Sequence, residues 1–220
     1  MLVRDRMTRQ PVTTEPDAPL HAALKLMRER RVHRLPVLQD GTLVGIVTER
    51  DAMYARLPSN NASEQPETDS ETLTVRQIMT SEVVTVSPDC PIEQAAAMMA
   101  DHTIGALPVV EGSESRTLVG IITETDIFTV FVEMLSARSP GVRASLEIDN
   151  RKGALASLFN RIVEVGGGVV TVSSFPAASP QRIRIILKVA DVDVATMRGL
   201  LKPEEVAIDI REILLSHHAT

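Results

Sequence analysis

The hydrophobic positions in the first part of the chain predict the same succession of elements twice. A short Val/Thr segment predicts a strand at 12–14 and again at 83–86. Each is followed by apolar residues that recur every three or four positions, which is typical of a helix packed on a core. Pro19 and Pro91 stand at the predicted first helical positions, where proline is well tolerated. The apolar helix residues are Leu20, Ala23, Leu24 and Met27 in the first set and Ile92, Ala95, Ala96 and Met99 in the second.

The segments after these helices also repeat. Leu35-Pro36-Val37 is followed by a turn at Asp40-Gly41, and a strand over 43–47 enters a second helix near Asp51. Shifted by 72 positions, residues 3–40 are identical to their counterparts at 14 of 38 positions; shifted by 75, residues 42–51 are identical at 8 of 10. The chain therefore contains a duplication, with a first repeat at 3–51 and a second repeat at 75–126. One copy of about 55 residues is too small to bury much core alone, so we expect the two to pack together.

The residues between the repeats, 58–72, are rich in Pro, Ser, Asn and Glu and contain almost nothing apolar. This composition predicts a flexible acidic linker. The predicted organisation is a first motif at 1–57, the linker at 58–72, a second motif at 73–137 that packs with the first as one module, and a further domain at 141–215.

The C-terminal region has a different pattern. Alternating apolar residues predict strands at 145–149, 169–172, 182–189 and 206–210. Helices are predicted at 153–165, which Gly166-Gly167-Gly168 ends, and at 192–201. The resulting βαββαβ order is that of a ferredoxin-like fold, in which both helices cover one side of a single sheet. The predicted fold class is therefore α+β (α/β): a tandem-repeat module followed by a ferredoxin-like βαββαβ domain.

Charge and composition narrow the classes of partner. The formal net charge is −6, and four of the acids, Glu64, Glu67, Asp69 and Glu71, lie in the linker. The remainder carries about −2, which predicts no general attraction to nucleic acid or to an anionic membrane. The first ten residues lack the apolar core of a signal peptide, and no apolar run approaches membrane-spanning length. We therefore expect a cytoplasmic protein.

One segment with candidate chemistry occurs in both repeats. Gly45–Asp51 and Gly120–Asp126 share the pattern Gly-h-h-Thr-x-x-Asp, where h is apolar, at the junction of a strand and a helix. A helix start attracts anions, and the Thr hydroxyl there can donate to a phosphate. A carboxylate one turn on can accept two hydrogen bonds from a ribose diol. The alternative is a capping box that needs no ligand; two copies in matching context favour the ligand site.

The repeats resemble the CBS domain pair, or Bateman module. The residues that carry the resemblance are Met7-Thr8 and Met79-Thr80, the two Leu-Pro-Val segments, and the two Gly-h-h-Thr-x-x-Asp strand ends. In that family the Thr and Asp hold the phosphate and ribose of adenosine compounds, and residues near the Val-Thr and Leu-Pro-Val segments enclose the adenine. The resemblance implies a first half-site of Thr13, Thr14, Arg34, Leu35, Pro36, Thr48 and Asp51, and a second of Thr85, Val86, Ala106, Leu107, Pro108, Thr123 and Asp126.

The two repeats differ in charge. The first has basic residues at Lys25, Arg28, Arg30 and Arg31 and the pair His33-Arg34, whereas the second has mostly small or apolar residues at the corresponding positions. Such a cluster can simply be a solvated helix face. Because His33 and Arg34 directly precede Leu-Pro-Val, the resemblance favours a phosphate beside them, and hence a larger role for Asp51 than for Asp126.

The C-terminal region resembles an ACT domain over residues 145 to about 215. Asn150-Arg151-Lys152-Gly153 stands where that family more often has Asp-x-Pro-Gly, which puts amino-acid binding in doubt. The resemblance implies an effector site at Asn150, Gly153, Ala154 and Gly167, and dimers formed edge to edge. The alternative is a dimerisation unit without a ligand.

The order of two CBS motifs and an ACT-like domain resembles that of acetoin-utilisation proteins. It implies a non-catalytic homodimeric sensor of AMP, ADP, ATP or S-adenosylmethionine that acts on an unknown regulated partner. The alternative is a structural adaptor with vestigial nucleotide sites. We expect no enzyme and no metal site, because no nucleophile–base constellation or clustered metal ligands appear, and we expect Cys90 to be inert.

Overall fold

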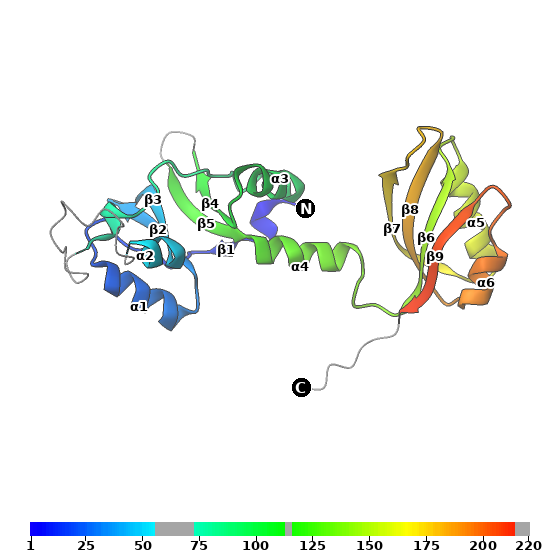
Figure 1. Cartoon of the computed structure of the whole chain (residues 1–220), viewed down its shortest axis with the longest axis horizontal. Helices are drawn as coiled ribbons and strands as arrows, with labels where there is room; N and C mark the ends of the chain where they lie inside the picture. The colour runs from blue at the N-terminus through cyan, green and yellow to red at the C-terminus, as the bar shows by residue number, and fades with distance from the viewer. Residues whose placement is uncertain (56–72, 113–115, 214–220) are drawn as a thin grey trace, which may run out of the picture. The chain divides into compact units, whose positions relative to one another are not determined.

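The computed structural model describes residues 1–55, 73–112 and 116–213. The chain divides into two compact units, Met1–Ile127 and Phe128–Thr220, which are described separately (Figure 1). Each contains an antiparallel sheet, so the predicted mixture of helices and sheets is confirmed. The predicted linker at 58–72 lies outside the described residues. No helix in the described part of the chain is long and apolar enough to cross a membrane.

Each repeat of the N-terminal unit consists of a helix, a β-hairpin and a second helix. The prolines Pro19 and Pro91 are the N-caps of the first helices, one position earlier than predicted. The hairpins pair with each other through β3 and β5. The helices are α1 (Leu20–Arg30), α2 (Glu49–Tyr54), α3 (Ile92–His102) and α4 (Glu124–Met134), and the short 3-10 helices are η1 (Val3–Asp5) and η2 (Val75–Gln77). The strands are β1 (Thr8–Arg9), β2 (Arg34–Gln39), β3 (Thr42–Thr48), β4 (Ala106–Glu111) and β5 (Thr117–Thr123).

The prediction of strands at 12–14 and 83–86 is wrong, because neither segment forms a strand in the structure. Each segment makes one parallel bridge, Thr14 with Val37 and Val86 with Val109. The Thr14 N–H donates to Pro36 O, and the Leu38 N–H donates to Thr14 O. The next bond of a parallel ladder would need an N–H at Pro36, which proline lacks, so the pairing stops there. The second repeat has Pro108 at the same place.

The beginning of each repeat packs on the other repeat. The N–H groups of Val3 and Arg4 donate to Cys90 O and Pro88 O, both at 2.9 Å. In the mirror arrangement, the N–H groups of Val75 and Arg76 donate to Ala18 O at 3.0 Å and Pro16 O at 2.8 Å. Val75 is fully buried in the core of the first repeat, among residues of α1, β2 and β3. The two repeats therefore complete each other's cores.

Ion pairs accompany this exchange. Arg4 pairs with Asp89, and Arg76 with Asp17 at 3.0 Å. The hydrogen bond and charge of Arg76 lower the pKa of Asp17 below its usual value. All four side chains are well exposed, so these pairs contribute little to stability.

A methionine of each repeat lies close to a glycine of the other repeat. A β-carbon built on Gly120 would lie 2.6 Å from Met7 Sδ and 3.0 Å from Thr8 O. A β-carbon on Gly45 would lie 2.6 Å from Met79 Sδ and 3.2 Å from Thr80 O. The two distances of 2.6 Å to sulfur are shorter than any that real β-carbons show. Only glycine therefore permits these approaches.

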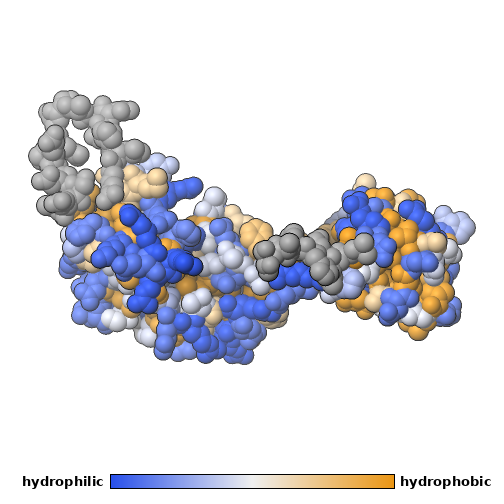
Figure 2. All heavy atoms as spheres, turned by 90° about the horizontal axis from the view of Figure 1, so that it is seen from below, coloured by the Kyte–Doolittle hydropathy of each residue, from blue (hydrophilic) through white to orange (hydrophobic). Residues whose placement is uncertain are grey.

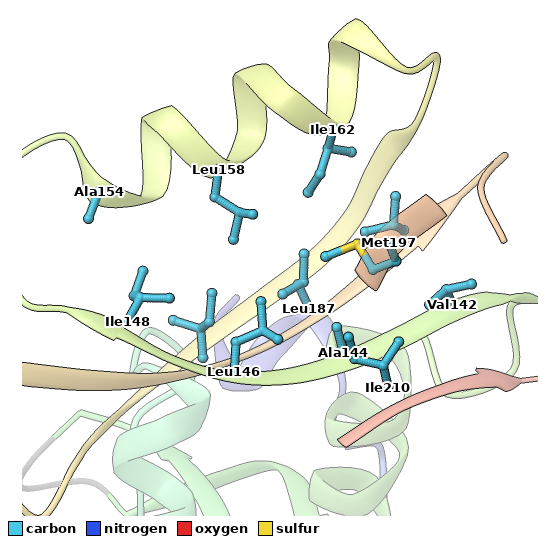
Figure 3. Packing of buried hydrophobic residues seen from close by; sticks show 12 residues of the cluster. Val142, Ala144, Leu146, Ile148, Ala154, Leu158, Ile162, Leu187, Met197 and Ile210 are labelled. Carbon is cyan, nitrogen blue, oxygen red and sulfur yellow. The ribbon is translucent and has the colours of Figure 1, made fainter. Parts of the chain in front are cut away.

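The C-terminal unit is a four-stranded sheet with both helices on one face, in the predicted βαββαβ order (Figure 1). Its resemblance to an ACT domain stays a prediction. Residues of α5 and α6 pack on alternate residues of the central strands β6 and β8 (Figure 3). The strand order is β7-β8-β6-β9, so β7 and β9 are the edges. The elements are β6 (Gly141–Asp149), α5 (Ala154–Glu164), β7 (Gly168–Pro176), β8 (Arg182–Ala190), α6 (Val194–Gly199) and β9 (Val206–Ile213).

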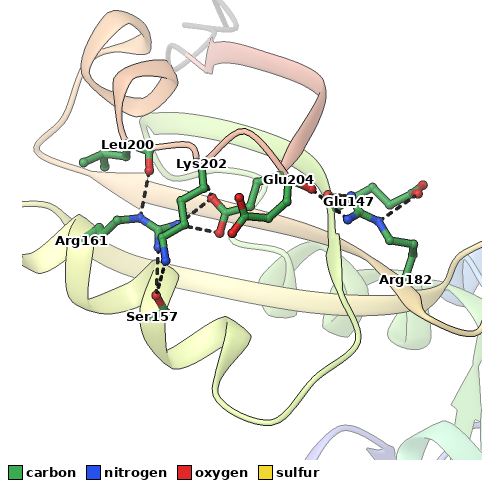
Figure 4. Close-up of polar contacts among 8 residues, drawn as sticks. Glu147, Ser157, Arg161, Arg182, Leu200, Lys202 and Glu204 are labelled. Carbon is green, nitrogen blue, oxygen red and sulfur yellow. Dashed lines mark hydrogen bonds and ion pairs between the residues drawn. The ribbon is translucent and has the colours of Figure 1, made fainter.

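A half-buried polar cluster fixes the connection from α6 to β9 (Figure 4). Arg161 on α5 binds both carboxylate oxygens of Glu205 at 2.6 Å, and its Nε donates to Leu200 O at 2.9 Å. On the other side of the sheet, Arg182 donates to Glu147 O and to the carboxylate of Asp149, both at 2.7 Å. Both bonds to Glu205 come from one nitrogen of Arg161, Nη2, and they are charge-assisted, which makes them stronger than bonds between neutral groups.

The surface of the C-terminal unit shows hydrophobic side chains at both sheet edges. Val170 and Val172 on β7 are 42% and 40% exposed, and Val206 and Ile208 on β9 are 54% and 49% exposed. On the face drawn in Figure 2, hydrophobic atoms cover much of this unit, whereas the N-terminal unit is mainly hydrophilic.

Because the opening segment of each repeat packs on the other repeat, Gly120→Ala should destabilise the N-terminal unit. The added methyl group meets Met7 and the Thr8 carbonyl, so we expect the free energy of unfolding to fall by about 1–3 kcal/mol in urea titrations. Gly199→Ala is the control, because nothing lies within 4 Å of its β-carbon position and it is in a helix. Equal stability of the two variants would contradict the role of the Met–Gly contact.

Candidate functional site

The Thr and Asp of each repeated segment form a hydrogen-bonded pair at a helix start. In the first repeat, the Thr48 N–H and hydroxyl donate to Asp51 Oδ2 at 2.9 and 2.8 Å, and the Asp51 N–H donates to Thr48 Oγ1 at 3.2 Å. In the second, Thr123 and Asp126 make the same three bonds at 2.8, 2.7 and 3.4 Å. The capping box is therefore present in both repeats.

The cap leaves part of each carboxylate available. All three bonds use Oδ2 or the Thr hydroxyl, and no other described residue donates to the Oδ1 atoms of Asp51 and Asp126. Both Asp residues are half-buried. The Thr hydroxyl has already used its one proton on the Asp, so it can only accept a further bond. The arrangement suits a donor such as a sugar hydroxyl at Asp, with Thr serving to orient the carboxylate.

The other predicted residues of each half-site lie on the same hairpin as this pair or beside residues bonded to that hairpin. Arg34 lies opposite Thr48 in the β2–β3 register, and Ala106 lies opposite Thr123 in β4–β5. The Thr14 N–H donates to Pro36 O at 3.0 Å, and the Val86 N–H donates to Pro108 O at 3.1 Å. Thr13 and Thr85 are half-buried and directly precede these bonded residues.

Leu35 and Leu107, two of the residues predicted to enclose the adenine, belong to the hydrophobic core. The side chains of Leu35 and Leu107 are fully buried, at 0% exposure. Only their backbone atoms and the flanking residues can therefore meet a ligand. His33 is exposed, and its Nδ1 lies 2.8 Å from Glu49 Oε2, while the Glu49 N–H donates to His33 O at 3.0 Å.

Sequence reasoning missed three residues beside the starts of α2 and α4, namely Glu49, Gly105 and Glu124. A β-carbon on Gly105 would lie 3.0 Å from Arg34 Nη1 and 3.1 Å from Glu124 Cδ. The guanidinium of Arg34 therefore lies beside the start of α4, in the other repeat. Glu49 occupies the equivalent start of α2. The signal was present in the alignment of the repeats: the Glu is identical in both, and Gly105 stands opposite His33.

The C-terminal unit has a small open cavity at the start of α5. Its volume is about 210 Å³. Asn150, Gly153 and Ala154 of the predicted effector site line it, together with Arg151 and Ile183. Gly167 does not line it, because its α-carbon faces Ile162 and Val192: an added β-carbon would lie 2.8 Å from both side chains. Gly167 is buried and packs closely on these two side chains, and its part in an effector site stays a prediction.

Cys90 is the only cysteine of the chain. Burial and the charge of Glu93 raise the pKa of the Cys90 thiol, which disfavours the reactive thiolate. In residues 1–55, 73–112 and 116–213, no three His, Cys, Asp or Glu side chains are grouped so that they could hold a metal ion.

Comparisons with known families and sequences agree on the repeats. A family model described as CBS domain matches residues 3–57 and 75–133. The chain is 31% identical over 139 residues to the CBS domain-containing protein YhcV of Bacillus subtilis (strain 168), covering 63% of this chain and 89% of that protein. It is 37% identical over 120 residues to an inosine-5'-monophosphate dehydrogenase of Korarchaeum cryptofilum, covering 54% of this chain but 22% of that enzyme. The chain thus spans less than a quarter of that relative.

Two solved structures have similar folds. The CBS domain pair of protein MJ0100, solved in complex with 5'-methylthioadenosine and S-adenosyl-L-methionine, has a TM-score of 0.51 and 29% identity, covering 60% of this chain and 97% of that chain. A Vibrio cholerae protein described as an acetoin utilization protein (AcuB) has a TM-score of 0.52 and 31% identity, covering 62% of this chain and 93% of that chain.

Proposed function

The chain belongs to the CBS domain family, and on that premise we propose that it is a non-catalytic sensor of an adenosine-containing ligand. The observation that carries the proposal is the pair of oriented carboxylates, each with Oδ1 open. A ribose diol offers the hydroxyl donors that Asp51 and Asp126 can accept. The adenosine compounds bound by the CBS pair of MJ0100 support the same ligand class. AMP, ADP, ATP and S-adenosylmethionine are the candidates.

The proposed output passes through α4. This helix begins beside Thr123 and Asp126, so a ligand there contacts its first turn. At its other end, Thr171 Oγ1 on β7 donates to Met134 O at 2.8 Å. Lys188 Nζ on β8 donates to Ser136 O at 2.6 Å and Ser139 O at 2.7 Å. One helix therefore has a candidate ligand at its start and the C-terminal sheet at its end.

Lys188 is an unusual residue for such a position. It is only 4% exposed, and burial together with the charge of Arg143 lowers the pKa of its ammonium group. Burying a charge is costly unless hydrogen bonds compensate for lost water. Carbonyls after a helix end attract cations, because the helix dipole adds negative potential there. Lys188 thus joins the end of α4 to the sheet through bonds that an apolar residue cannot make.

We propose further that the chain acts as a cytoplasmic homodimer whose ligand state changes the ACT-like domain or a regulated partner. Exposed apolar residues in each unit support association: Met53 and Tyr54 on α2 of the N-terminal unit, and Phe128, Phe131 and Met134 on the part of α4 that belongs to the C-terminal unit. The second candidate is an adaptor in which the Thr–Asp pairs are only helix caps. The observation that favours this candidate is the complete capping box in both repeats, because its hydrogen bonds form without any ligand.

Ligand binding separates the two candidates. We expect AMP, ATP or S-adenosylmethionine at 100 times its Kd to stabilise the N-terminal unit by about 2.7 kcal/mol, because only the folded protein binds it. The measurement is thermal unfolding with and without each compound. The control is the double variant Asp51→Ala, Asp126→Ala, in which the ligand-induced shift should disappear. No shift with any adenosine compound in the unmodified chain would favour the adaptor.

If α4 carries the output, Lys188→Met should leave ligand binding intact but remove the effect of the ligand on the C-terminal sheet. We expect ligand affinity within about threefold of the original, because Lys188 belongs to the C-terminal unit and makes none of the hydrogen bonds of either Thr–Asp pair. We also expect the ligand to slow amide hydrogen exchange in β7 and β8 of the original chain but not in the variant. Lys152→Met, which removes an exposed lysine of the same unit, is the control. Slowed exchange that survives Lys188→Met would contradict this path.

A further inference from the structure

Two methionine sulfur atoms lie at the joint between the repeats, at equivalent positions of the duplication. Met7 Sδ lies 2.6 Å from the position of a β-carbon on Gly120, and Met7 Cγ lies 3.1 Å from it. Met79 makes the same two approaches to Gly45, again at 2.6 and 3.1 Å. Each sulfur therefore lies against the backbone of a strand that belongs to the other repeat.

The backbone holds each methionine in this place. Thr80, the residue after Met79, exchanges two hydrogen bonds with Ile46 of β3, at 2.9 and 3.0 Å. Thr8, the residue after Met7, begins β1, which pairs with β5 of the second repeat. A change at either sulfur that pushes the side chain away from the glycine therefore strains the pairing that joins the repeats.

Exposure separates these two methionines from most of the nine in the chain. Three are buried, with at most 6% exposure, and three others are at least 52% exposed: the buried ones are Met27, Met99 and Met197, and the exposed ones are Met1, Met53 and Met134. Met7 and Met79 are half-buried, so a small oxidant can reach side chains that are also packed. Met98 is half-buried too, but its counterpart in the first repeat is Leu26, so its position is not a methionine in both repeats.

Oxidation changes what the sulfur can tolerate as a neighbour. Hydrogen peroxide transfers one oxygen to a thioether: the sulfur–oxygen bond forms as the oxygen–oxygen bond breaks, and the second oxygen leaves as water. The product, methionine sulfoxide, is polar and chiral, and its oxygen requires a hydrogen-bond donor. The nearest backbone atoms at the two contacts are carbonyl oxygens, Thr8 O and Thr80 O, which accept but cannot donate. The sulfoxide oxygen therefore meets no donor from these two groups.

We infer that Met7 and Met79 are modification sites at which hydrogen peroxide loosens the joint between the repeats. Because Gly45 and Gly120 lie three residues before Thr48 and Thr123, the same oxidation acts on both Thr–Asp pairs. The change is reversible: a methionine sulfoxide reductase removes the oxygen as water while a dithiol is oxidised to a disulfide. This sensitivity to oxidants goes beyond the proposed function and does not depend on any ligand.

Peroxide treatment of the full chain followed by amide hydrogen exchange tests the inference. The chain carries Cys90→Ala, so that the thiol does not react, since alanine is the residue at the corresponding position 18. Peptide mass spectrometry should find sulfoxide at Met7 and Met79. Exchange in β3 and β5 should become about tenfold faster or more, because an unsatisfied polar group in a packed contact costs as much as a lost hydrogen bond. Exchange in β6 and β8 of the C-terminal unit should stay the same.

Two pairs of leucine substitutions assign the effect. Met7→Leu with Met79→Leu keeps an apolar side chain of similar volume and should make exchange in β3 and β5 resistant to peroxide. Met53→Leu with Met134→Leu removes two exposed methionines and should leave the sensitivity unchanged. A time course on the chain with Cys90→Ala alone needs no methionine variant. The faster exchange should follow sulfoxide formation at Met7 and Met79 rather than at Met53 and Met134.

Four results would overturn the inference. The first is oxidation of the exposed methionines without oxidation of Met7 and Met79. The second is sulfoxide at both positions with unchanged exchange in β3 and β5. The third is equal acceleration in the Met7→Leu, Met79→Leu variant. The fourth is failure of methionine sulfoxide reductases A and B with dithiothreitol to restore slow exchange, which would show damage rather than a reversible modification.

Discussion

The close approach of a methionine from one repeat to a glycine of the other is the constraint on which the N-terminal unit depends. Met7 lies against Gly120, and Met79 against Gly45, so each hairpin accepts the opening segment of the other repeat. The buried Val75 in the core of the first repeat follows from the same exchange. A repeat of this size cannot bury enough apolar surface alone, and the exchange supplies the missing part of each core.

The candidate sites inherit their geometry from this packing. Gly45 and Gly120 lie on the strands that end at Thr48 and Thr123, so the contact that joins the repeats is three residues from each Thr–Asp pair. The near-symmetry gives two similar half-sites, and small departures from it give them different chemistry. Gly105 is one such departure, because the absence of a side chain there lets Arg34 extend to the start of α4. The other is α4 itself, whose last residue accepts a bond from Thr171 and is followed by two carbonyls that Lys188 binds.

The sequence predicted most of the fold because the duplication and the hydrophobic spacing are local and strong. The hairpins, the four helices of the repeats and the βαββαβ order follow from them. The sequence could not predict that residues 12–14 make only one bridge. This depends on the segment lying beside Pro36, which lacks the N–H that a longer ladder would need. Nor could it place Gly167 in the core or Arg34 across the repeats, since both depend on distances between segments far apart in the chain. The Thr–Asp pair was visible as a pattern, but only its hydrogen bonds show that one carboxylate oxygen stays open.

The central claim is that the two repeats are one cooperative unit, and native-state hydrogen exchange measures this directly. Amides in β3 of the first repeat and β5 of the second should open with the same free energy, equal to that of global unfolding of the unit, because neither core is complete without the other. The two values should also fall together as urea is added. Opening free energies that differ by more than about 1 kcal/mol between β3 and β5, or different dependences on urea, would show that the repeats unfold separately and would contradict the claim.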